Sequence, residues 1–104
     1  MRRSNLAGDV QPMQQEAAQT VALQALTWIL GDPATLEAFL GATGVAVGDL
    51  GARAREPEFH GAILDFLLMD DQWVIGFCDA SGLAYTVPMA ARTALPGGQQ
   101  EHWT

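Results

Sequence analysis

Basic residues are scarce in this sequence of 104 residues. Lysine is absent, and five arginines stand against twelve acidic residues, which gives a formal net charge of −7. Arg2 and Arg3 precede the first apolar-periodic segment, so the rest of the chain carries three arginines, Arg53, Arg55 and Arg92. Nucleic-acid binding depends on basic side chains that neutralise phosphates, and an acidic surface repels anionic lipid. We therefore expect neither nucleic acid nor a membrane as a partner.

Cysteine and long apolar runs are also rare. The single cysteine, Cys78, excludes an intrachain disulfide and a cysteine-based metal cluster. No uninterrupted apolar stretch approaches the length of a membrane span. No apolar stretch follows Arg2 and Arg3 as a secretory signal would require. These features predict a cytoplasmic protein.

The residues that are abundant predict a helical core. Apolar residues make up 49% of the chain, and Ala and Leu, which favour helices, are frequent among them. A chain of this length supports one core and is too short for two ordinary domains. We expect a single all-α domain over residues 13–96, a compact bundle of five to six short helices. Residues 1–12 and 97–104 are expected to be flexible tails.

The first predicted helix, residues 13–30, shows apolar residues at the spacing of one helix face. Its expected inward residues are Ala18, Val21, Ala22, Ala25, Leu26 and Ile29. Further helices are expected over 33–43, around 50–54, along the apolar stretch after Glu56-Pro57, from Asp70-Asp71 to Gly82, and over 86–95. In the short third helix, Asp49 and Arg53 have the spacing of a helical ion pair.

The two halves of the sequence show an internal similarity. A shift of 38 residues, the separation of Asp32 and Asp70, aligns the pairs Leu26/Leu64, Leu30/Leu68, Phe39/Phe77, Ala42/Ala80 and Gly44/Gly82. In each half an Asp is placed to cap a helix, and a Gly is placed to end it in the left-handed conformation. The pattern predicts two pseudo-repeated helical triplets.

Several segments resemble a known family. They are residues 22–29 (ALQALTWI), Phe39-Leu40 with Thr43-Gly44, and residues 63–68 (ILDFLL) with Asp70-Asp71 and Phe77-Cys78. Over roughly residues 15 to 97, the sequence resembles the small bacterial family called domain of unknown function 3572. The resemblance implies a short, helical, bacterial protein, and it implies no activity, substrate or site.

Three features could carry chemistry, and each has a simpler interpretation. His60 has no His or Cys three or four residues away, so we expect an exposed or half-buried helix residue and no metal site. Cys78 is followed by Asp79, whose charge opposes thiolate formation, so a buried packing thiol is expected. Asp70-Asp71 precedes an apolar-periodic segment and is expected to cap a helix. We assign no catalytic, cofactor-binding or metal-ligating residue.

Trp73 and Tyr85 are the remaining candidates for function. They occupy the positions of Thr35 and Val47 in the first repeat, so the second half carries extra aromatic bulk. This bulk would either cover the other half of the molecule or anchor another protein or a second copy. The sequence thus favours a protein-interaction or regulatory module. The alternatives are an enzyme whose site is not visible in the sequence and a nucleic-acid-associated factor.

Overall fold

The computed structural model describes residues 13–96; the two predicted tails, 1–12 and 97–104, lie outside the described residues. The described elements are α2 (Gln15–Leu30), α3 (Pro33–Thr43), the 3-10 turn η1 (Val47–Asp49), α4 (Leu50–Arg53), α5 (Pro57–Leu67), α6 (Asp71–Ser81) and α7 (Val87–Ala94). Residues 13–96 contain no strand. The all-α prediction is confirmed, and six α-helices fall within the predicted number for this part of the chain.

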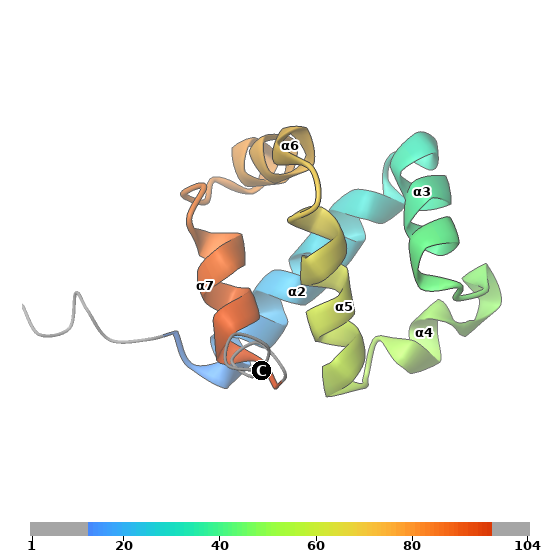
Figure 1. Ribbon diagram of the computed structural model, residues 1–104, viewed down its shortest axis with the longest axis horizontal. Coiled ribbons are helices and arrows are strands. Elements are labelled where there is room, and N and C mark those ends of the chain that lie inside the picture. Colours follow the sequence, from blue (N-terminus) through green and yellow to red (C-terminus); the bar gives the residue numbers. More distant parts are fainter. Residues whose placement is uncertain (1–12, 97–104) are drawn as a thin grey trace, which may run out of the picture.

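Helices α2 and α5 cross at the centre of the bundle, as Figure 1 shows. Helix α7 packs against both of them, α3 and α4 lie on one side, and α6 lies across one end. All six residues predicted to face inward from α2 are buried: Ala18, Val21, Ala22, Ala25, Leu26 and Ile29. They join one hydrophobic core with residues of every other α-helix.

The helix ends follow the predicted local chemistry. The Asp32 side chain accepts a hydrogen bond from a backbone N–H in the first turn of α3, and Asp70 does the same for α6. Gly44 and Gly82 end these helices with φ of 74° and 71°. This left-handed conformation costs Gly little and other residues more. The predicted caps at both positions are confirmed.

The two halves share contacts but differ in arrangement. Trp28 meets Phe77 edge to face at 6.2 Å, and the equivalent residues Phe66 and Phe39 meet edge to face at 5.2 Å. The third elements are not equivalent, because α7 packs on both central helices whereas α4 packs mainly with η1. The structure therefore does not confirm the duplication, which stays a prediction.

Candidate functional site

An open cavity lies between the C-terminal end of α3 and α5. Its volume is about 240 Å³. It is lined by Ala42, Thr43, Val45, Arg53, Phe59, Ala62, Asp65, Phe66 and Met69. We call this cavity the α3–α5 groove. It is the candidate site, since it combines an apolar floor with charged residues at its rim.

The floor of the groove is a stripe along α5. Phe59, Ala62, Phe66 and Met69 follow one another at intervals of three and four residues, which places them on one face of a helix. Phe59 and Phe66 are only 2% and 3% exposed, because both also pack edge to face against Phe39 of α3. Met69, just beyond α5, is 71% exposed. The groove thus ends in an exposed, flexible apolar side chain.

Arg53 forms the rim at the Phe59 end. Its guanidinium lies 5.5 Å from the centre of the Phe59 ring, and its Nε lies 3.3 Å from Oε1 of Glu56. The prediction that Arg53 pairs with Asp49 is wrong, since the described ion pair is with Glu56. Asp49 ends the 3-10 turn as the N-cap of α4, whereas Glu56 lies three residues after Arg53. About half of each partner is exposed, so the pair contributes at most about 1 kcal/mol.

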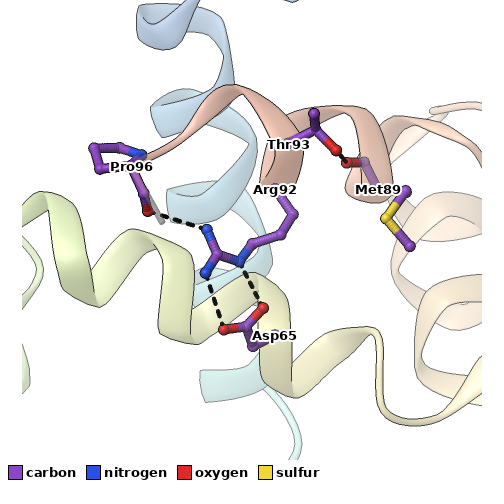
Figure 2. A network of polar contacts seen from close by, with 5 residues as sticks. All are labelled: Asp65, Met89, Arg92, Thr93 and Pro96. Carbon is purple, nitrogen blue, oxygen red and sulfur yellow. Dashed lines mark hydrogen bonds and ion pairs between the residues drawn. The ribbon is translucent and has the colours of Figure 1, made fainter. Parts of the chain in front are cut away.

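Asp65, at the middle of the groove, is held by Arg92 of α7. Figure 2 shows the Arg92 guanidinium between the Asp65 carboxylate and the Pro96 carbonyl. Nε and Nη2 donate to the two Asp65 oxygens at 2.6 and 3.3 Å, and Nη1 donates to the carbonyl at 3.2 Å. Such two-point contacts fix orientation as well as charge. Gly61 leaves room for them, because a Cβ there would lie 3.0 Å from Nη1.

Asp70 and Asp71 follow Met69 in the chain but do not line the groove. Asp70 accepts the backbone N–H of Gln72 at 2.9 Å, and Asp71 is exposed in the first turn of α6. Neither forms an ion pair within residues 13–96. The charged residues that line the groove itself are Arg53 and Asp65, and each has an ion-pair partner.

Trp73 and Tyr85, the predicted interaction residues, occupy different surroundings. The half-buried Trp73 ring stacks on Phe66 with centroids 4.3 Å apart, so it supports a ring that also lines the groove. Tyr85 is 55% exposed and donates to Oδ1 of Asp79 at 2.7 Å. That hydrogen bond and the negative charge of Asp79 raise the pKa of the Tyr85 phenol. The structure places Trp73 beside the groove and does not place Tyr85 there; an interaction role for either stays a prediction.

His60 is buried, and the expectation of an exposed or half-buried residue is wrong. It is 5% exposed, and its Nε2 lies 2.6 Å from the Ala54 carbonyl oxygen. Nε2–H is therefore the donor, and Nδ1 has no hydrogen-bond partner in the described structure. This hydrogen bond joins His60 of α5 to Ala54, the C-cap of α4.

Cys78 is buried as predicted, with 1% exposure, and its Sγ donates to the Ala84 carbonyl at 3.5 Å. Burial, and to a lesser extent the charge of Asp79, raises the pKa of the Cys78 thiol. Both effects favour the neutral thiol, which is a poor nucleophile. The arrangement is that of a packing residue.

Two further findings concern residues 13–96 alone. No three His, Cys, Asp or Glu side chains in this part gather closely enough to hold a metal ion. None of its helices combines the length and the apolar character needed to cross a membrane.

Most residues of the groove were not singled out in the sequence. The sequence feature that could have indicated them is the spacing of Phe59, Ala62, Phe66 and Met69. This spacing predicts that they share one face of a helix, but a face buried in the core would show the same spacing. Whether that face is covered depends on how far α3 extends over it, and helix periodicity does not report this distance.

Comparison with known proteins gives a family. No curated protein and no solved structure was found to match the chain. A family model described as "Protein of unknown function (DUF3572)" matches residues 15–98, which include all the described helices and the whole groove. The chain belongs to this family of unknown function.

Proposed function

We propose that the protein is an interaction module that binds a segment of another protein in the α3–α5 groove. The observation that carries the proposal is the open cavity over the apolar stripe of α5, which ends in the exposed Met69. Buried apolar anchors supply most of the free energy in such interfaces. The groove offers a site where a partner side chain would be buried against Phe59 and Phe66.

The size of the groove favours protein side chains over an enclosed small ligand. Small-molecule pockets usually measure about 300–1,000 Å³ and enclose most of their ligand. The groove measures about 240 Å³ and is open to solvent. One or two apolar side chains of a partner would fill it.

Trp73 would support partner binding without lining the groove itself. Because its ring stacks on Phe66, it fixes the orientation of one aromatic wall of the groove. A preformed wall lowers the ordering cost of binding. We propose that Trp73 acts by holding Phe66 in position.

Site-directed photo-cross-linking in living cells tests the proposal. A photoreactive phenylalanine analogue replaces Met69 in one version of the protein and Met89 in a matched control. Both methionines are exposed, at 71% and 57%, but Met89 lies on α7 and does not line the groove. We expect a discrete cross-linked protein band from position 69 and none of the same size from position 89.

A second change identifies the groove as the origin of the band. Ala62→Trp fills the groove from its floor, and Met69 remains available for labelling. The band should disappear in this variant while circular dichroism shows a folded helical protein. A band that persists in folded Ala62→Trp, or that arises equally from position 89, would refute the proposed site.

A further inference from the structure

We propose that Trp103 of this chain occupies the α3–α5 groove when no partner is bound, so that residues 97–104 compete with the partner for the site. The consequence for binding rests on the proposed function, whereas the contact itself does not. Three observations carry the proposal: the position of Pro96, the residues that follow it in the sequence, and the size of the groove.

The chain passes beside the groove at Pro96. Nη1 of Arg92 donates to the Pro96 carbonyl at 3.2 Å, and Nε of the same side chain donates to Oδ1 of Asp65 at 2.6 Å. A single guanidinium group therefore separates the Pro96 carbonyl from a side chain that lines the groove, as Figure 2 shows. Because residue 97 is bonded to this carbonyl carbon, residues 97–104 are attached beside the groove.

Residues 97–104 have the sequence GGQQEHWT, in which Trp103 is the one large apolar side chain. It follows Pro96 by seven residues, and seven extended residues span up to about 25 Å. From Phe59 to Phe66 the α5 side of the groove rises only about 10 Å, so Trp103 can reach all of it. An indole ring buries a large apolar area while its N–H remains on the open side.

The groove suits one tethered side chain. Phe59 and Phe66 are 2% and 3% exposed, so the open volume is bounded chiefly by the more exposed Val45, Ala62 and Met69. Stable protein–protein interfaces bury about 1,200–2,000 Å², more than a groove of about 240 Å³ supplies. A partner must therefore add contacts outside the groove. A tethered side chain needs none, because a short tether gives it an effective concentration of about millimolar.

Disulfide trapping in the full chain tests the contact. Thr104→Cys places a thiol beside Trp103, and Met69→Cys places a second thiol at the groove. The matched control pairs Thr104→Cys with Met89→Cys, an exposed position on α7 outside the groove. Cys78 stays in both proteins, because it is 1% exposed. Under mild oxidation we expect the intrachain disulfide to form at least about tenfold faster with position 69 than with position 89, since the occupied groove holds the two thiols together.

Two further changes connect the trapping to Trp103 and to the groove. Trp103→Ser should abolish the preference for position 69, and Ala62→Trp, which fills the groove, should abolish it as well. Equal rates at the two positions, or a preference that persists in Trp103→Ser, would overturn the inference. A disulfide between two chains in place of the intrachain one would also overturn it, because a second copy would then supply the occupant.

Photo-cross-linking separates this inference from the proposed function. With the photoreactive analogue at position 69, Trp103→Ser should increase the cross-linked partner band at least about threefold, because more of the protein then has an empty groove. An unchanged band would overturn the competition. If trapping depends on Trp103 but no partner band forms in either version, the proposed function is refuted and the contact of Trp103 with the groove stands.

Discussion

Replacing Gly76 with alanine tests the close approach of α6 to α2. An ideal Cβ at Gly76 would lie 2.9 Å from Cζ2 of Trp28, well inside the normal separation of about 3.5–4.0 Å between carbon atoms. Trp28 cannot move away without cost, because its ring meets Phe77 edge to face at 6.2 Å. The added methyl group therefore has to displace the Trp28 ring and disturb its contact with Phe77.

The magnitude follows from two opposing effects. Alanine stabilises a helix interior relative to glycine by about 1 kcal/mol, whereas overpacking a core costs about 1–3 kcal/mol. Gly76→Ala should therefore destabilise the protein by about 1 kcal/mol. Gly41 in α3 is the matched control, since a Cβ there meets nothing within 4 Å. Gly41→Ala should stabilise the protein by up to about 1 kcal/mol.

Thermal and urea unfolding followed by circular dichroism would measure both variants. For a domain of this size, about 1 kcal/mol corresponds to a shift in Tm of about 4–8 °C, so the two variants should move in opposite directions. Adding Trp28→Leu to Gly76→Ala should remove most of the overpacking penalty in a double-mutant cycle. If Gly76→Ala raises Tm as much as Gly41→Ala does, Trp28 is free to move and the close packing of α6 on α2 is refuted.

Three further predictions concern the core, a cap and the thiol. Phe66→Ala should lower the free energy of unfolding by about 3–5 kcal/mol, because it empties the space between Phe39 and Trp73; a loss below about 1 kcal/mol in urea titrations would show that α5 is not central. Asp70→Ala should cost about 1 kcal/mol in the same assay through loss of the α6 cap, and Asp70→Ser should restore most of it. Burial raises the pKa of the Cys78 thiol in the folded state, so its contribution to stability is fully present below the unfolded pKa of about 8.5 and is lost as pH rises through the folded pKa. The free energy of unfolding should fall above about pH 9, and it should fall less steeply in Cys78→Ala. An aromatic disulfide reagent should label the native thiol only as fast as the protein unfolds. Rapid labelling would contradict the burial of Cys78.

The parts of the fold that depend on neighbouring residues could be predicted from the sequence. The buried face of α2 follows from the spacing of its apolar residues, and the caps at Asp32 and Asp70 follow from the residues beside them. Gly44 and Gly82 adopt the left-handed conformation for the same local reason. Helix ends and amphipathic faces need no information on tertiary structure.

The parts that depend on distant contacts were not predictable. His60 is buried and bonds the Ala54 carbonyl, which lies before the start of α5, and no periodicity within α5 reports that contact. Arg53 has one acidic residue four places before it and another three places after it, and spacing alone does not decide which of them it pairs with. The groove arises where α3 leaves part of α5 uncovered, and only the packed helices determine the position of that edge.

The position of α7 has a consequence for synthesis on the ribosome. This helix packs against α2, the first described helix, and against α5, but the chain supplies it only after all the helices from α2 to α6. Chains commonly fold by domain as they emerge, and here the core cannot close until residues 87–94 have left the ribosome. Until then the side of α2 that α7 will cover faces solvent, and a nascent chain halted before α7 presents that surface to chaperones.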